Sequence, residues 1–409
     1  MNLLAASMIA STFYLHAGDR VVFYGDSITE QRLYTTYVEA FVATRYPGLD
    51  VEFFNRGWAG DSSWGGGGGV PEERVRRDVV PLKPTAVVVL LGMNDGGYVP
   101  VDPKIEAVIH DWYPKVLDLL SPRGSSIRLT LARTSPWDDF AHHYNSVGKP
   151  PEPWAPWKGY NDVLRTYGEI AEREAKTRNG IYVDFNVPLS QVLIRAAAED
   201  PVTAATIIPD VIHPGPAGHL VMAGELLKAW NVDPFVSELT IDALSARVVE
   251  ANRTSISEFK GLAWKQMDRS LPFNMNSEDN VIHLANKISG FDEQLNRQIL
   301  RVKGLDAGNY QLLIDGKAVS TFRSDVLEQG VNLATIDTPM RRQSQKVFEL
   351  CHRRAEVEFF AWRSVQRENG DLPHTHDAYR SLSALCEDLR DKIKQTAQPR
   401  QHTFSLKRI

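Results

Sequence analysis

The chain has 409 residues, of which 43% are hydrophobic and 24% are charged. These shares are those of an ordinary globular protein, so collagen-like, disordered and coiled-coil chains are excluded, and the length suggests two or three folding units. The 46 Lys and Arg and the 51 Asp and Glu give a net charge of -5, and no basic stripe is present, so we expect no nucleic-acid partner.

The N-terminus contains a short apolar run, Leu3–Ala10, that no Lys or Arg precedes. Such a run suits the core of a signal peptide, and it equally suits a buried segment that leads into a first strand. We therefore treat residues 1–17 as a leader or an N-terminal segment. No other stretch approaches the ~18 consecutive apolar residues of a membrane span, so none is expected.

Residues 18–230 alternate between short runs rich in β-branched or aromatic residues and longer segments with helical spacing, which is typical of a parallel sheet with crossover helices. The predicted strands are Arg20–Tyr24, Val51–Asn55, Ala86–Leu91, Ile127–Ala132 and Ile181–Phe185. The predicted helices are Thr29–Tyr46, Pro71–Val80, Ile105–Leu120, Trp157–Thr177 and Gly215–Trp230. Three of the strands are continuously apolar, as in sheets covered on both faces. The pattern predicts a three-layer α/β unit.

The pattern changes after Asn231. Residues 231–340 alternate in strand fashion and include Asp315-Gly316, a strong hairpin signal, so we predict a β-rich accessory segment. The expected strands are Glu238–Asp242, Arg247–Ala251, Ser255–Lys260, Ile299–Lys303, Tyr310–Ile314 and Ala318–Phe322. Residues 341–409 are charged and predicted to be helical, with helices at Val347–Val365 and Ala378–Thr396. The two cysteines, Cys351 and Cys386, fall in these helices and form no Cys-x-x-Cys motif, so neither a disulfide framework nor a cysteine zinc site is expected.

Four short blocks lie where open α/β sheets place their sites, after the carboxyl ends of strands or before the last helix. The first is Gly25-Asp26-Ser27, where a strand passes directly into a helix. Ser27 is either a nucleophile at a helix N-terminus, which favours developing negative charge, or only a helix cap. The second block, Asn55–Ser62, holds glycines that could bring backbone amides close to a ligand, or it is an ordinary turn.

The third block is Gly92-Met93-Asn94-Asp95, where Asn94 either directs its amide at an oxyanion or forms an Asx-type turn. The fourth is Asp210-Val211-Ile212-His213. An Asp three residues before a His can reach its Nδ1–H and leave Nε2 free as a base, although a surface histidine is the alternative. Taken together, the four blocks supply the roles that an acyl-transfer site requires.

The four blocks resemble those of the SGNH/GDSL hydrolase family in order and spacing, over about residues 18–230. The matching parts are the Gly-Asp-Ser triplet, the block-two glycine, Gly92-x-Asn94 and Asp210-x-x-His213. The resemblance implies a flavodoxin-like αβα fold and a serine esterase. It implies Ser27 as nucleophile, His213 as base, Asp210 as the group that orients it, and Ser27, Gly60 and Asn94 as oxyanion donors. It also implies no metal or cofactor, and it favours a periplasmic or secreted location. The departures from the family are the Gly65–Gly69 tract and the long tail after Asn231.

Aromatic side chains are frequent in the loops near these blocks, and they suit either sugar rings or loop anchoring. They are Trp58, Trp64, Trp137, Tyr144, Trp154, Trp157 and Tyr160. We predict Trp58, Trp64 and Asp95 as substrate contacts. The glycine tract is either a mobile lid or a flexible spacer. The proline-rich connection 134–156 is expected to shape the substrate pocket. His374-x-His376 and His142-His143 are expected to be exposed rather than metal ligands.

No long apolar helix pair that would cover a fatty chain is expected, so we favour acetyl or other short acyl esters of a carbohydrate as substrates. Two alternatives remain: acyl transfer to a sugar, which shares the acyl-enzyme, and a polysaccharide-binding protein that retains an esterase fold. The substrate is therefore a small molecule or a polysaccharide ester, and the oligomeric state is left open.

Overall fold

The computed structural model describes residues 13–139, 159–274 and 279–409. The first unit is built on a parallel sheet whose strand order is β2-β1-β3-β4-β5. The strands are β1 (Asp19–Gly25), β2 (Val51–Gly57), β3 (Ala86–Leu90), β4 (Arg128–Arg133) and β5 (Ile181–Asp184). This order is that of flavodoxin-like sheets, with β1 between β2 and β3. All five predicted strands are therefore confirmed to within two residues at each end.

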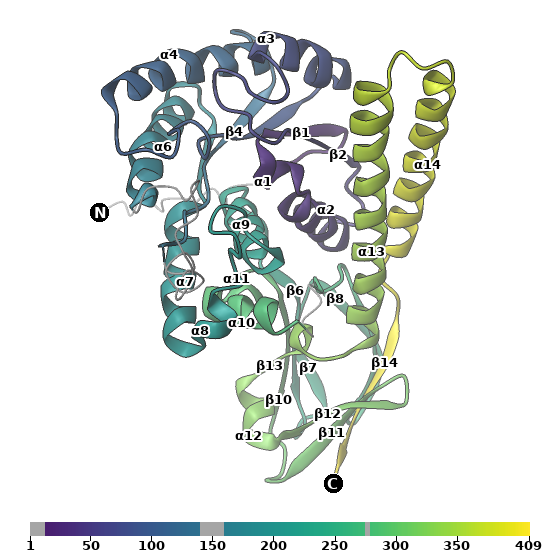
Figure 1. The fold of residues 1–409 in the computed structure, drawn as a ribbon. Helices are drawn as coiled ribbons and strands as arrows, with labels where there is room; N and C mark the ends of the chain where they lie inside the picture. Colours follow the sequence, from purple (N-terminus) through teal and green to yellow (C-terminus); the bar gives the residue numbers. More distant parts are fainter. Residues whose placement is uncertain (1–12, 140–158, 275–278) are drawn as a thin grey trace, which may run out of the picture.

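Helices cover both faces of this sheet (Figure 1). One face carries α3 (Pro71–Arg74), α4 (Pro103–Leu120) and α6 (Tyr160–Thr177). The other carries α2 (Leu33–Arg45) and α9 (Pro216–Ala229), with α7 (Asn186–Glu199) and α8 (Pro201–Ala204) beyond them. The five residues of β3 are all fully buried, as a strand covered on both faces requires. The predicted three-layer α/β unit is confirmed.

Two of the predicted helices are interrupted. The expected helix 29–46 is divided into α1 (Ser27–Glu30) and α2 because Arg32 adopts a left-handed conformation, with φ of 63°. The expected helix 71–80 consists of α3, a π-helical turn η1 (Val75–Val79) and a short 3₁₀ turn η2 (Val80–Leu82). Helical periodicity does not distinguish these variants from a continuous α-helix, because all of them place one face on the core.

The accessory region packs two sheets around a second core that includes Leu300, Leu312 and Trp264. One sheet has the order β13-β10-β6-β7 and the other β12-β11-β14-β9-β8. Their strands are β6 (Phe235–Asp242), β7 (Arg247–Asn252), β8 (Thr254–Lys260), β9 (Ala263–Asp268), β10 (Arg297–Lys303), β11 (Asn309–Ile314), β12 (Lys317–Arg323), β13 (Val331–Asn332) and β14 (His402–Arg408). The region also contains α10 (Asn280–Ser289), α11 (Phe291–Leu295), α12 (Ser324–Gln329) and a 3₁₀ turn η3 (Leu333–Thr335). The β-rich accessory region is confirmed.

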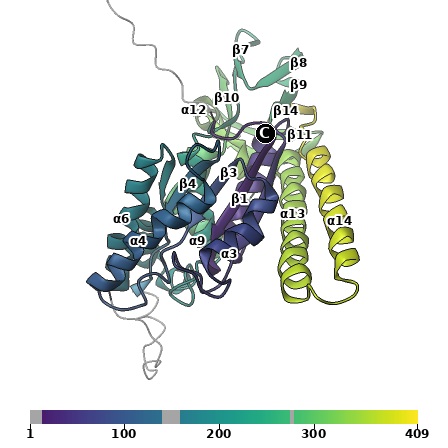
Figure 2. The same ribbon diagram turned by 90° about the horizontal axis from the view of Figure 1, so that it is seen from above.

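The C-terminal helices form a hairpin that lies against the α/β unit beside α2 and β2 (Figures 1 and 2). It consists of α13 (Pro339–Phe360), a π-helical continuation η4 (Ala361–Glu368) and α14 (Thr375–Thr396). The expectation that the chain stays helical to its end is wrong, because the last residues form β14, which pairs with both β9 and β11 in the accessory sheet. Sheet pairing overrides the charged, helix-like composition of this end. The boundaries proposed at residues 17, 230 and 340 stay predictions.

In the described part of the chain, none of the helices combines the length and apolar character that crossing a membrane requires.

Candidate active site

Ser27 lies where β1 ends and α1 begins. The preceding Asp26 is the N-cap of α1, and its Oδ1 accepts a hydrogen bond from the Ile28 amide at 2.9 Å. This tight strand-to-helix turn brings Ser27 to the carboxyl edge of the sheet, where its side chain is partly exposed.

Ser27, His213 and Asp210 form a continuous hydrogen-bonded chain. Ser27 Oγ lies 2.7 Å from His213 Nε2, and His213 Nδ1 lies 2.7 Å from Asp210 Oδ2. Asp210 Oδ1 also accepts hydrogen bonds from the amides of Ile212 and His213, at 3.1 and 2.7 Å, which fix the carboxylate. With Nδ1–H donated to Asp210, the Nε2 lone pair of a neutral imidazole faces the serine hydroxyl.

The carboxylate and the imidazole shift each other's pKa. The hydrogen bond to Asp210 raises the pKa of His213 above 6.5; burial opposes this effect, and the charges of Asp210 and Asp26 add to it. Partial burial works against ionisation of Asp210, but the hydrogen bonds from His213 outweigh it and lower the pKa of the carboxyl. Asp210 is therefore an anion that stabilises the protonated form of the neighbouring imidazole.

Asp26 is a second carboxyl group close to the serine. Its complete burial raises its pKa to about 7, against the hydrogen bond from Ile28, and the charge of the nearby Asp95 raises it further. Among the described residues its Oδ2 has no hydrogen-bond partner. The group thus titrates near neutrality next to the nucleophile.

From Gly57 to Asp61, where β2 passes into the following loop, four of the five backbone amides donate hydrogen bonds. Gly57 N–H donates to Asn55 Oδ1, Trp58 N–H to Gly25 O, Ala59 N–H to Glu30 Oε2 and Asp61 N–H to Trp58 O. Among the described residues, no acceptor is found for the Gly60 amide. Gly60 has a φ of 79°, which lies in the left-handed region that glycine adopts without strain.

Asn94 follows β3, and both polar atoms of its side-chain amide form hydrogen bonds. Its Nδ2 donates to the Asp61 carbonyl at 2.9 Å, and its Oδ1 accepts from the Tyr98 hydroxyl at 2.9 Å. One Nδ2–H remains for another acceptor. Because β1 lies between β2 and β3, Ser27, Gly60 and Asn94 all follow neighbouring strands at one edge of the sheet.

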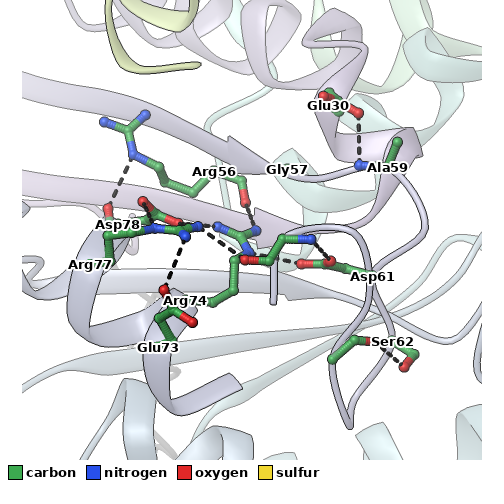
Figure 3. A network of polar contacts seen from close by, with 12 residues as sticks. Glu30, Arg56, Gly57, Ala59, Asp61, Ser62, Glu73, Arg74, Arg77 and Asp78 are labelled. Carbon is green, nitrogen blue, oxygen red and sulfur yellow. Dashed lines mark hydrogen bonds and ion pairs between the residues drawn. The ribbon is translucent and has the colours of Figure 1, made fainter. Parts of the chain in front are cut away.

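A buried ionic network lies under this loop (Figure 3). Arg74 is fully buried; its Nε donates to Asp61 Oδ2 at 2.8 Å, its Nη1 to Asp78 Oδ2 at 2.7 Å and its Nη2 to the Arg56 carbonyl at 2.8 Å. Asp78 also accepts from Arg77. The network joins the loop after β2 to η1.

Only part of the predicted substrate surface is exposed. Asp95 is 1% exposed and its Oδ1 accepts from the Ser63 amide, so it holds the loop rather than facing solvent. Trp137 and Tyr160 are buried in the core at 2% and 0% exposure. Trp58 and Trp64 are half-buried. The remaining aromatic candidates, Tyr144, Trp154 and Trp157, lie outside the described residues.

The glycine tract, expected to be a mobile lid or a flexible spacer, is folded against the loop after β2 in this structure. Two isolated bridges, between Ser62 and Gly65 and between Gly66 and Gly69, fold it back on itself. A Cβ on Gly66 would lie 2.2 Å from the Gly60 carbonyl oxygen, so the tract packs directly on the loop after β2. Its glycines provide close backbone approach.

No group of three or more His, Cys, Asp or Glu side chains that could hold a metal ion is found within residues 13–139, 159–274 and 279–409. His374 and His376 are among these residues; His142 and His143 lie outside them. The residues that sequence reasoning missed are Glu30, Arg74, Trp362 and Arg363, which contact the loop after β2. No local motif marks them: Trp362 and Arg363 meet the loop from about 300 residues away, and Arg74 is an ordinary basic residue in a helix.

Residues 23–221 match the model of the GDSL-like Lipase/Acylhydrolase family. The structure is similar to that of a gut microbial diltiazem-metabolizing enzyme, with a TM-score of 0.81 and 24% identity. The match covers 97% of this chain and 99% of that enzyme's chain. An acetylxylan esterase, Axe2 from Geobacillus stearothermophilus, matches 54% of this chain with 97% of its own, at a TM-score of 0.39 and 20% identity. None of the curated proteins matches the chain.

Proposed function

We propose that this chain, which belongs to the GDSL-like lipase/acylhydrolase family and is an ester hydrolase, removes short acyl groups, above all acetyl groups, from a carbohydrate. The reaction proceeds by way of an acyl-enzyme on Ser27. The observation that carries the proposal is the chain of two 2.7 Å contacts from Ser27 Oγ through His213 to Asp210. A nucleophile, a base and a group that orients the base are the three parts that such a reaction requires.

In the first step, Ser27 Oγ attacks the ester carbonyl carbon and its proton passes to His213 Nε2. Asp210 stabilises the imidazolium that forms. The negative charge on the carbonyl oxygen is met by the Ser27 amide, the free Gly60 amide and the remaining Nδ2–H of Asn94. Preorganised donors of this kind act mainly on the transition state, because the charge develops only there.

Collapse of the tetrahedral intermediate expels the alcohol, which takes its proton from His213 Nε2. Water then attacks the acyl-enzyme while His213 accepts one of its protons, and a second collapse releases the carboxylic acid and restores Ser27. Acyl transfer would differ only in the last acceptor, a sugar hydroxyl in place of water.

The preference for a short acyl group is supported by the surroundings of Ser27. In the part of the chain that the structure describes, the loops after β1, β2 and β3 carry no long apolar helix that could shelter a fatty chain. The half-buried rings of Trp64 and Tyr98 in these loops suit a flat polar ligand such as a sugar.

The test is acetate release from acetylated xylan and other acetylated polysaccharides, together with kcat/KM for 4-nitrophenyl esters of increasing acyl length. Diltiazem, which carries an acetate ester, belongs in the panel because of the structural similarity. We expect acetate release that Ser27→Ala removes, and kcat/KM that falls as the acyl chain lengthens. A preference for long acyl chains, or no acetate from any polysaccharide, would contradict the proposed substrate class.

A further inference from the structure

We propose that η4 of the C-terminal hairpin is part of the active-site framework and that Arg363 is a positioning residue for the Gly60 amide. The inference rests on the proposed function, because it concerns the donor that would meet the oxyanion. It also concerns the part of the chain outside residues 23–221, the range that matches the family. Three sets of contacts carry it.

The first set surrounds Trp58, two residues before Gly60. The Arg363 guanidinium lies 3.4 Å from the Trp58 ring centroid, and the Trp362 ring stands edge-on to it at 5.8 Å. Arg74 and Arg77 lie against the same indole at 5.1 and 5.2 Å. A stacked guanidinium restricts the ring more than a flexible ammonium would, so η4 fixes the position of Trp58.

The second set runs through Glu30, the last residue of the helix that Ser27 begins. Glu30 Oε2 accepts the Ala59 amide at 2.7 Å, and Glu30 Oε1 forms an ion pair with Arg363 Nη1 at 3.5 Å. One carboxylate therefore joins the serine helix to the peptide before Gly60, and Arg363 balances its charge. Figure 3 shows the Glu30–Ala59 contact above the Arg74 network.

The third set of contacts runs through Asp78. Trp362 Nε1 donates to Asp78 Oδ1 at 3.1 Å, and Arg74 joins Asp78 to Asp61, the residue after Gly60. Asp78 lies on η1 and Trp362 on η4, so two π-helical turns face each other across this contact. Such turns are uncommon and are often found at functional sites.

The glycine tract also contacts this loop. The Gly68 amide donates to Asp61 Oδ1 at 2.9 Å, and a Cβ on Gly67 would lie 2.6 Å from the Ala59 carbonyl oxygen. The loop from Trp58 to Asp61 is thus in contact with both the tract and η4. The two features that depart from the family pattern, the tract and the tail, converge on one oxyanion donor.

Arg363→Ala tests the proposal, with Arg353→Ala, an exposed arginine of α13, as the matched control. We expect kcat for 4-nitrophenyl acetate to fall about ten- to hundredfold, because a displacement near 1 Å in a site has effects of this size, and KM to stay within about twofold. Inhibition by phenylboronic acid, whose serine adduct is tetrahedral, should weaken by the same factor as kcat. Arg363→Lys, which keeps the charge but not the flat stack, should restore part of the loss.

Trp362→Phe keeps the ring packing but removes the bond to Asp78, and it provides a second variant if Arg363→Ala folds poorly; we expect a smaller loss of kcat. The inference is overturned if kcat of Arg363→Ala matches that of Arg353→Ala, or if kcat falls while boronate inhibition is unchanged. Activity that survives Ser27→Ala would instead overturn the proposed function, which separates the two failures.

Discussion

The indole N–H of Trp362 donates a hydrogen bond to Asp78 across 284 residues of chain, at 3.1 Å. Asp78 is also bound by Arg74, which binds Asp61, and the Asp61 carbonyl accepts the amide of Asn94. A series of contacts therefore runs from the C-terminal hairpin to two of the proposed oxyanion donors. The tail is not a separate appendage, and substitutions along this series should affect both stability and turnover.

Arg74→Met should strongly destabilise the protein. The fully buried guanidinium neutralises Asp61 and Asp78, and removing one partner of a buried ionic group typically costs about 3–5 kcal/mol. Urea unfolding measures the change, and Arg76→Met, at an exposed position on the same turn, is the control. Equal unfolding free energies for the two variants would show that the network does not stabilise the fold.

Gly66→Ala should impair both folding and catalysis. The added methyl group would meet the Gly60 carbonyl at 2.2 Å, so the loop must shift, at a cost typical of overpacking, about 1–3 kcal/mol. Gly48→Ala, where no heavy atom lies within 4 Å of the added carbon, is the control. We expect a lower kcat and a lower unfolding midpoint for Gly66→Ala alone; a kcat equal to that of the control would argue against close packing of the tract on this loop.

Asn94→Ala should lower kcat by a factor on the order of 10²–10³ with little change in KM, because it removes a donor that acts on the transition state. Tyr98→Phe keeps that donor and removes only the hydroxyl that orients it, so its loss should be smaller. Steady-state kinetics with a 4-nitrophenyl ester distinguish them. A larger effect for Tyr98→Phe than for Asn94→Ala would exclude Asn94 as an oxyanion donor.

The pH dependence of kcat/KM should report His213. The base must be neutral to accept a proton, and its pKa is raised above 6.5 by Asp210, so activity should rise with pH through an apparent pKa above 6.5. In Asp210→Asn the imidazolium loses its anionic partner, so this limb should move to lower pH. The plateau should fall by a factor on the order of 10²–10⁴. A limb that stays in place or moves to higher pH would contradict the assignment of Asp210.

The fold could be predicted where pattern and environment agree. Val88 and its neighbours in β3 are continuously apolar because helices cover both faces of the sheet, and the turn at Asp315-Gly316 has two residues at positive φ, as its sequence indicates. The last strand could not be predicted, because Phe404 and Leu406 are its only two fully buried residues and its place between β9 and β11 depends on distant partners.

In the candidate site, too, residues in local motifs could be predicted and residues whose surroundings come from distant parts of the chain could not. Ser27, Asn94 and His213 stand in short blocks at the ends of strands or before a helix, where the sequence itself marks them. Asp95, predicted as a substrate contact, is buried and accepts a hydrogen bond from the Ser63 amide, and an acidic residue in a loop gives no sign of such burial. The contact of Arg363 with Trp58 could not be predicted, because it depends on where η4 packs in the fold.

Covalent labelling with diethyl 4-nitrophenyl phosphate, followed by peptide mass spectrometry, shows whether Ser27 is the nucleophile. We predict one diethylphosphoryl group per chain, on the peptide that contains Ser27, with esterase activity lost in proportion to labelling, and no labelling of His213→Ala on the same timescale. Labelling at another residue, or esterase activity that persists in fully labelled protein, would show that Ser27 is not the nucleophile.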